Sequence, residues 1–191
     1  MAKLYDKTKG SALGSGKIMP PASLLDQALL GTLARYRRSV ASSYSPIGLV
    51  ELSSVFAAAG KGEVFLSEKL DGELWFLVLQ GKEAFLANSR GRVIHGKLPF
   101  LNEAQDIAKK TGDQLAVFAG ELYATSAAGK DRPRAADLAA ALAGGKSQAG
   151  HLYFAVFDIV ELHTEDEDLT TYGAKLEKLT GMFGEGEHLA I

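Results

Sequence analysis

Cysteine is absent from the 191 residues, so the chain forms neither disulfide bonds nor thiolate metal sites. A charge excess is absent too, since 21 Lys and Arg residues face 23 Asp and Glu residues and the formal net charge is -2. Any binding of nucleic acid therefore has to come from a local patch. Apolar runs are too short and too often broken by charge to span a bilayer, and none of signal-peptide length precedes Pro20. The sequence predicts a soluble, intracellular protein with no membrane contact.

The first third of the chain divides into two parts. Residues 1–19 are rich in lysine, glycine and serine, a composition that leaves little to bury and predicts a mobile leader. Residues 20–60 are predicted to be mainly helical. Ser23 can cap a helix that runs to about Val40, with Asp26 in its first turn, and its apolar positions have helical spacing: Leu25, Leu29, Leu33 and Tyr36. A shorter apolar stretch, Leu49 to Ala59, ends at Gly60.

Three arginines stand at the end of the first predicted helix. Arg35, Arg37 and Arg38 can contact phosphates, but cations in a last turn also favour the helix dipole. The sequence leaves both interpretations open.

The remainder, 61–191, alternates strand and helix patterns. Short turns connect apolar runs into an antiparallel meander, and helices follow further along. Strands are expected at 63–68, 73–80, 83–88, 92–95, 114–124 and 152–160, and helices at 102–111 (capped by Asn102), at 135–143 and from Thr170 or Thr171 onward. This order predicts an α+β fold with antiparallel sheets flanked by helices.

The segment Lys69-Leu-Asp71-Gly72 lies between two of these strands. A lysine held at a sheet edge can be oriented toward a ligand and partly desolvated, as a nucleophilic amine requires. Asp-Gly is also a common hairpin signal, so an ordinary turn beside a surface lysine is the alternative.

Several segments, in order, resemble the adenylation (nucleotidyltransferase) domain of ATP-dependent DNA ligases, which is related to RNA ligases and mRNA capping enzymes. Lys69-Leu-Asp71-Gly72 is similar to the K-x-D-G motif, and Ser89-Arg90-Gly91 to the motif after it. Gly120-Glu121-Leu122 resembles the third motif, a D-G-E-L strand, and Tyr153 to Asp158 the aromatic strand that follows. The helix around Tyr172 to Leu179 is similar to the family's next helix. The resemblance implies an ATP-grasp-like nucleotidyltransferase fold.

The resemblance covers about 60–190, and 61–191 is expected to be a partial adenylation domain. The family's last two motifs, an E-G-hydrophobic strand and a K-x-K strand, and its oligonucleotide-binding domain do not appear before Ile191. We therefore expect a part of a longer ligase, and a natural product that is incomplete as a ligase is the alternative. Glu185-Gly186 is similar to the start of the E-G-hydrophobic strand, but 185–191 is expected only to approach it.

The resemblance also implies the chemistry. Lys69 is the expected nucleophile, which attacks the α-phosphate of ATP, carries AMP as a lysyl phosphoramidate and passes it to a 5′-phosphate at a nick in DNA during replication, repair or recombination. A free lysine is protonated near neutral pH, so a divalent metal, Mg²⁺ or Mn²⁺, and desolvation by the nucleotide are expected to help. Asp71 and Gly72 support the motif.

The other site residues have expected roles by resemblance. Arg90 contacts the ribose or the nucleic-acid phosphate, and Glu121 accepts from a ribose hydroxyl or binds a metal through water. Phe157 stacks on the adenine, with plain core packing as its alternative. The backbone at Ser67 and Glu68 reads the adenine amino group.

Departures from the family pattern bear on the substrate. Leu74 stands where DNA ligases have arginine, a contact that Arg92 is a candidate to replace, and Ala119 replaces the aspartate of the third motif. Ser67 replaces a common glutamate, and Glu73 stands where RNA ligases often have serine. An RNA ligase, another covalent nucleotidyltransferase, a binding module without catalysis and a coincidence of motifs in an unrelated α+β domain stay as alternatives.

Overall fold

A computed structural model describes residues 3–44, 46–62, 64–111, 114–125, 132–143, 149–164 and 167–191. Its centre is an eight-stranded sheet in the order β1-β2-β5-β4-β3-β6-β7-β8. The strands are β1 (Ser11–Leu13), β2 (Gly16–Met19), β3 (Glu73–Gln80), β4 (Glu83–Ala87), β5 (Val93–Gly96), β6 (Ala116–Ala124), β7 (Leu152–Glu161) and β8 (Leu189–Ala190). The α-helices are α1 (Gln27–Ser39), α2 (Leu52–Ala59), α3 (Pro99–Thr111), α4 (Ala135–Ala143) and α5 (Tyr172–Phe183), and Ala41–Ser43 and Ala149–His151 form 3-10 turns.

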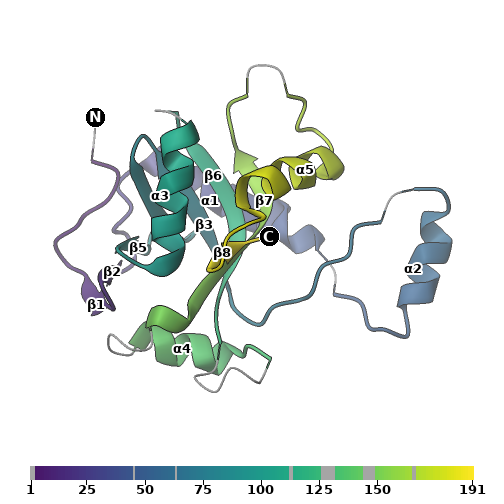
Figure 1. Cartoon of the computed structure of the whole chain (residues 1–191), viewed down its shortest axis with the longest axis horizontal. Helices are drawn as coiled ribbons and strands as arrows, with labels where there is room; N and C mark the ends of the chain where they lie inside the picture. Colours follow the sequence, from purple (N-terminus) through teal and green to yellow (C-terminus); the bar gives the residue numbers. More distant parts are fainter. Residues whose placement is uncertain are drawn as a thin grey trace.

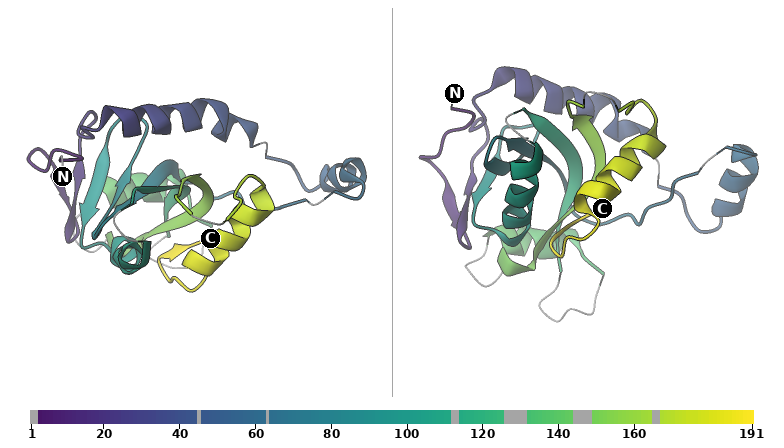
Figure 2. Two further views of the ribbon diagram at one scale, coloured as in Figure 1. Left: turned by 90° about the horizontal axis from the view of Figure 1, so that it is seen from above. Right: turned by 45° about the horizontal axis from the view of Figure 1, so that its top comes forward.

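Helices cover both faces of the sheet. Figure 2 shows α1 along one face, which we call the α1 face, with α3 and α5 on the other, the α3 face. Each face of the sheet has its own hydrophobic core, and the side chains of β3 point alternately to one and to the other. Phe76 and Val78 pack with α1. The residues that pack on the α3 face are Trp75, Leu77 and Leu79. Within the described residues, all strand pairs are antiparallel except β7 with β8. The predicted α+β class is confirmed.

The first helix begins later than predicted. Asp26, not Ser23, is the N-cap of α1, and its carboxylate accepts from the backbone N–H groups of Ala28 and Leu29, both at 3.0 Å. Ser23 is buried, and its N–H donates to the Gly91 carbonyl at 2.9 Å. The N–H groups of Ser23 and Leu24 both donate to the Gly91 carbonyl, so the helix starts only after these two residues. Further along the chain, α3 begins at Pro99 rather than after Asn102.

The expected mobile leader does not hold for residues 3–19. Within this segment, 11–13 and 16–19 form β1 and β2 at the edge of the sheet, and β2 pairs with β5 from Gly16 opposite Gly96 to Met19 opposite Val93. Leu13, Ile18 and Met19 are buried there. A partner strand far along the chain supplies apolar contacts that the local composition does not reveal.

No strand forms at 64–68, where one was predicted. The adjoining strand β3 is paired on both sides, with β4 and β6, so this apolar segment cannot pair with it, and Phe65 and Leu66 stay exposed at 44% and 53%. Residue 63 lies outside the described residues. At the other end of the chain, Leu189 and Ala190 pair with β7, so this part of 185–191 is itself a short strand.

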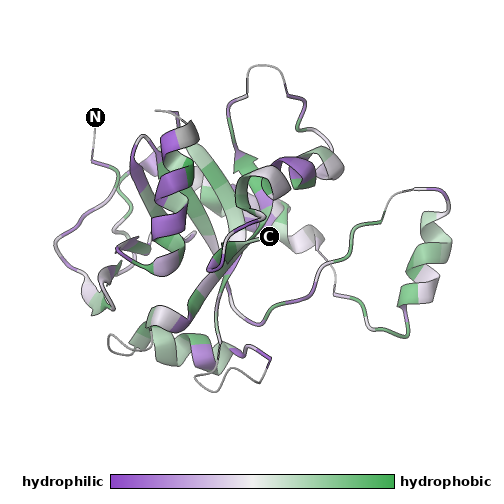
Figure 3. Cartoon of the chain, viewed as in Figure 1, coloured by the Kyte–Doolittle hydropathy of each residue, from purple (hydrophilic) through white to green (hydrophobic). Residues whose placement is uncertain are grey.

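One helix lies away from the sheet. Figure 1 shows α2 at the end of two long connections, and Figure 3 shows much of it as hydrophobic. None of its residues is buried, in agreement with that placement. Among the described residues, no helix has both the length and the apolar character needed to cross a membrane.

Candidate functional site

Two segments of the predicted site meet at one end of the sheet. The backbone N–H of Gly72 donates a 3.1 Å hydrogen bond to Oε1 of Glu121. This bond joins the turn before β3 to a side chain on β6. Leu74 in β3 lies opposite Glu121, and Glu121 lies opposite Ala155 in β7. Three neighbouring strands therefore bring their residues together around one carboxylate.

Gly72 permits this approach because it has no side chain. A Cβ at this position would clash with the carbonyl oxygen of Leu122 and would lie 2.9 Å from Cγ of Glu121. The turn therefore lies directly against the backbone of β6.

Lys69 itself points into solvent. Its side chain is 65% exposed, and Nζ lies 3.5 Å from Oδ1 of Asp71, whose side chain is 57% exposed. Its carbonyl oxygen accepts a 2.6 Å hydrogen bond from the guanidinium of Arg132. The backbone at Lys69 is thus fixed on both sides, by Arg132 and by Gly72, while the ammonium stays accessible.

Glu121 is the half-buried carboxylate of the site. Burial raises the pKa of Glu121 above its ordinary value, and the charges of Asp71 and Glu73 act in the same direction. The N–H of Gly72 and the positive charge of Lys69 oppose this shift of the pKa. Since Oε1 accepts from Gly72, the second oxygen is left for a ligand.

The Ser89-Arg90-Gly91 turn lies at the same end of the sheet. It follows β4, whose last residue, Ala87, is opposite Phe76 of β3. The buried side chain of Asn88 holds the turn, since its Oδ1 accepts from the N–H groups of Arg90 at 3.0 Å and Arg92 at 3.1 Å. The Arg90 side chain is exposed.

Phe157 lies on the α1 face, as Leu74 does. Its ring is 5.7 Å from that of Tyr44 in an edge-to-face arrangement, and its carbonyl accepts from the Tyr172 hydroxyl at 3.1 Å. Burial and the nearby Asp158 charge raise the pKa of Tyr44 to about 12. Phe157 is half-buried rather than plain core, so one part of the ring is left for a ligand.

An ion pair between a buried carboxylate and a partly exposed lysine fixes β7 next to Phe157. Asp158 is 2% exposed and accepts hydrogen bonds from Lys175 of α5 at 2.9 Å and from the Tyr36 hydroxyl of α1 at 2.8 Å. Lys175 also donates to the Ile159 carbonyl at 2.9 Å. Irregular pairing between β6 and β7 occurs at the same place, so this cluster joins both helices to a bulged strand.

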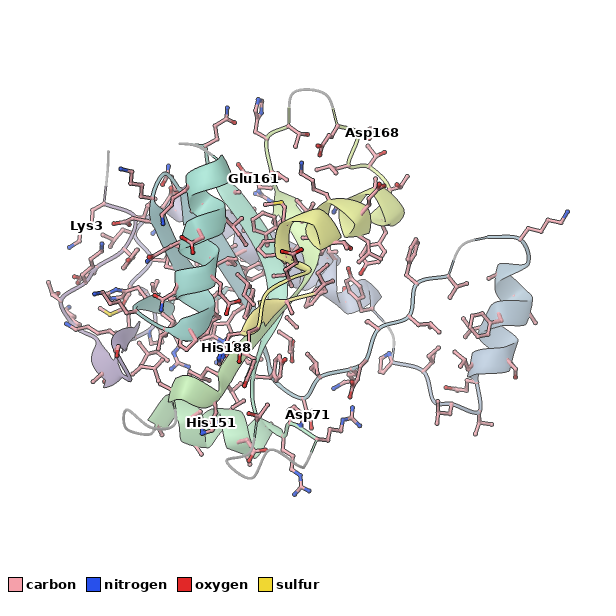
Figure 4. All side chains as sticks on the ribbon, viewed as in Figure 1. Lys3, Asp71, His151, Glu161, Asp168 and His188 are labelled. Carbon is pink, nitrogen blue, oxygen red and sulfur yellow. The ribbon has the colours of Figure 1, made fainter. Side chains whose placement is uncertain are left out.

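The structure brings some predicted residues together and leaves others apart. Glu121 contacts the turn of Lys69, whereas Ser67 and Glu68 lie exposed on the approach to it and their backbones form no hydrogen bond with other described residues. Two surface hollows contain none of the predicted site residues, one of about 540 Å³ beside α5 and one beside Leu115 and Leu162. Figure 4 shows Glu161 and Asp168, which line them, at the opposite end of the molecule from Asp71.

Sequence reasoning missed Tyr44 and Arg132. Tyr44 lies in a loop without periodicity, and Arg132 lies in a charged loop that resembles an ordinary solvated connection. No spacing within the sequence connects either residue to its partner.

Among the described residues, no group of three or more His, Cys, Asp or Glu side chains is placed to hold a metal ion. The sequence matches no protein-family model and no curated protein.

Proposed function

We propose that this chain is the nucleotide-binding part of an ATP-dependent polynucleotide ligase of the DNA ligase type, with a nucleotidyltransferase fold, and that Lys69 accepts AMP. The hydrogen bond from Gly72 to Glu121 is the observation that carries the proposal. It links two segments, 49 residues apart, that resemble motifs of one family, and a coincidence of sequence gives no reason for them to touch.

The reaction needs one bond to form and one to break. Nζ of Lys69, once deprotonated, attacks the α-phosphorus of ATP, a P–N bond forms, and the bond to the bridging oxygen breaks so that pyrophosphate leaves with the electron pair. The ammonium proton passes to solvent or to a phosphate oxygen. The nearby Asp71 carboxylate, 3.5 Å from Nζ, positions the ammonium before the nucleotide binds.

Glu121 fits the role of a partner to Mg²⁺ through water. A single carboxylate with one free oxygen suits a cation that keeps most of its waters and takes its other ligands from phosphates. Such a metal would supply charge neutralisation on the phosphates. The ribose hydroxyl is the other group that this oxygen can accept from.

The remaining roles follow from position. Phe157 offers a ring for the adenine on the same sheet face as Leu74. The backbone at Ser67 and Glu68 forms no hydrogen bond with another described residue, so it is available to the amino group of the adenine. Arg90 is exposed for contact with a ribose or a phosphate. Arg92 is less free to replace the arginine missing at Leu74, because its guanidinium lies 5.7 Å from the centre of the Trp75 ring.

A second candidate is a nucleotide-binding module that does not form the adduct. The Lys69 side chain is 65% exposed, which favours this second candidate, because a nucleophilic amine is usually activated by desolvation or by a neighbouring cation. ATP binding without covalent transfer distinguishes this candidate from the first.

The test is incubation of the chain with Mg²⁺ and ATP, followed by intact and peptide mass spectrometry. An addition of about 329 Da, the mass of an adenylyl group, is expected on Lys69. Lys69→Ala abolishes it, whereas Lys82→Ala, in the turn at the other end of β3, retains it. Binding of ATP with no adduct contradicts the first candidate and supports the second. An adduct on another lysine contradicts both.

A further inference from the structure

Arginine is unevenly distributed along this chain. Five of its seven arginines lie in two segments, Arg35, Arg37 and Arg38 in the first and Arg90 and Arg92 in the second. Neither segment contains an acidic residue, from 27 to 50 or from 84 to 102. In a chain of net charge -2, these segments are local sources of positive charge.

The fold brings the two segments together. The Ser89-Arg90-Gly91 turn lies along α1, because the Gly91 carbonyl accepts from the N–H groups of Ser23 and Leu24, just before the helix. Nearer its other end, the Arg37 guanidinium donates to the Ser89 hydroxyl at 3.1 Å. Arg90, whose side chain is exposed, is therefore the middle residue of a turn that Arg37 of the helix contacts.

The arginines of α1 are on its outer side. Leu29, Leu33 and Tyr36 are buried against the sheet, and Arg35, Arg37 and Arg38 are exposed. Arg35 and Arg38 are three residues apart, so their Cβ atoms are about 5–6 Å apart on the helix surface. Tyr36 contacts Asp158, the residue after Phe157, so this surface borders the candidate nucleotide site.

None of these arginines is neutralised by a carboxylate within the described part of the chain. The ion pairs seen there are all made by lysines: Lys3, Lys7, Lys69, Lys109, Lys175 and Lys178. The Arg35 guanidinium donates to a neutral group, the Thr32 hydroxyl, at 3.0 Å. The helix dipole accounts for Arg37 and Arg38 in the last turn, but it does not account for Arg90, which comes from a different element.

We infer that Arg35, Arg37, Arg38 and Arg90 form a surface that binds the phosphate backbone of a nucleic-acid duplex. Guanidinium groups bind phosphate oxygens through planar, bidentate contacts, and those without a carboxylate partner pay no cost of breaking an ion pair. Backbone contacts of this kind position a duplex without reading its sequence. The choice of a nucleic acid as the polyanion rests on the proposed function, whereas the positive surface itself does not.

The test is titration of the chain with a labelled nicked DNA duplex, without ATP, at salt concentrations from about 50 to about 200 mM. Arg35→Gln with Arg38→Gln is expected to weaken binding about tenfold or more at the lowest salt. It should also make the slope of log affinity against log salt less steep by about 2, one phosphate contact for each arginine.

The control variant removes the same charge elsewhere. Lys82→Gln with Lys109→Gln neutralises two exposed lysines, one in the turn between β3 and β4 and one on α3, and is expected to bind within about twofold of the wild type. Arg35→Lys with Arg38→Lys should keep the salt slope, and thermal melting confirms that every variant is folded. Equal weakening by the two glutamine pairs overturns the inference, because only total charge then matters.

Other outcomes separate the inference from the proposed function. No binding of the duplex by the wild type at the lowest salt overturns the inference, even if the adduct forms on Lys69. Binding to vesicles of anionic lipid, with none to the duplex, also overturns it. Arginine-dependent binding of the duplex with no adduct supports the inference and counts against the proposed function.

Discussion

The backbone N–H of Gly72 and Oε1 of Glu121 are 3.1 Å apart, close enough for a hydrogen bond across two strands of the sheet. Because Lys69 lies three residues before Gly72, this contact sets the distance between an accessible amine and a half-buried carboxylate. The carboxylate of Glu121 therefore has a structural role, and the proposed function gives it a chemical one as well. Substitutions of Gly72 and of Glu121 should therefore affect stability and adduct formation differently.

Gly72→Ala is expected to lower the free energy of unfolding by about 1–3 kcal/mol, because the new methyl group would overlap the carbonyl oxygen of Leu122. The turn has to move away from β6, so adduct formation on Lys69 should fall as well. Urea denaturation measures the first effect and mass spectrometry the second. Gly181→Ala is the control, since its Cβ meets nothing within 4 Å in α5, and it should stabilise the protein by about 0.5–1 kcal/mol.

Glu121→Gln is expected to separate stability from activity. Burial raises the pKa of Glu121, so the folded state holds its proton more tightly than the unfolded state does. That contribution to stability is complete below the ordinary carboxyl pKa and is lost as the pH rises through the raised, folded-state pKa. At neutral pH the glutamine variant should therefore be at least as stable as the wild type, while its relative stability falls as the pH drops to about 4.

Adduct formation by Glu121→Gln should fall at neutral pH, although the stability of the protein does not. The amide oxygen of the glutamine variant can still accept from Gly72, but the neutral amide binds a metal-bound water or a ribose hydroxyl less strongly than a carboxylate does. Adduct formation should therefore slow about tenfold or more. Glu161→Gln, at the exposed end of β7, should change neither quantity. A glutamine variant that is as active as the wild type would remove Glu121 from the reaction.

Much of the fold was predictable because local patterns and tertiary contacts agree. Strands β3, β4 and β6 and helix α4 follow from apolar runs bounded by glycine or by short polar turns. The buried residues Leu13, Ile18 and Met19 stand among glycines and lysines without a strand-like pattern, and they are buried because β1 pairs with β2 and β2 pairs with β5. The opposite error occurred at 64–68, where an apolar run adjoins β3 but forms no strand, because both sides of β3 are already paired.

The site was predictable only in part for a related reason. Motif resemblance named Lys69 and Glu121, but the contacts that fix the site join residues far apart in sequence. Arg132 reaches the Lys69 carbonyl across 63 residues, and Tyr36 reaches Asp158 across 122. Side-chain direction, not spacing along the chain, decides such pairs.

Lys175→Met tests the cluster next to Phe157. It leaves the Asp158 carboxylate, whose side chain is 3% exposed, without its cation, and should lower the free energy of unfolding by about 3–5 kcal/mol. Lys178→Met on the same helix breaks only a partly exposed ion pair with Glu167, and should cost less than about 1 kcal/mol. Adding Asp158→Asn to Lys175→Met should restore part of the loss, because the buried negative charge is then gone. Strict additivity in this cycle would show that the pair is not coupled.

Phe157 and Phe154 test whether the two sheet faces have different roles. The two residues lie on the same strand, but Phe157 packs at the α1 face whereas Phe154 is 1% exposed in the core of the α3 face. Phe157→Leu should weaken ATP binding about tenfold, through loss of a stacking surface, and should cost less than about 1.5 kcal/mol of stability. Phe154→Leu should destabilise the protein more, because it changes a fully packed core, and should leave ATP affinity unchanged once the protein is folded. Calorimetric titration with ATP and urea denaturation of both variants give the comparison. Equal effects of the two substitutions on ATP affinity would place the nucleotide away from Phe157.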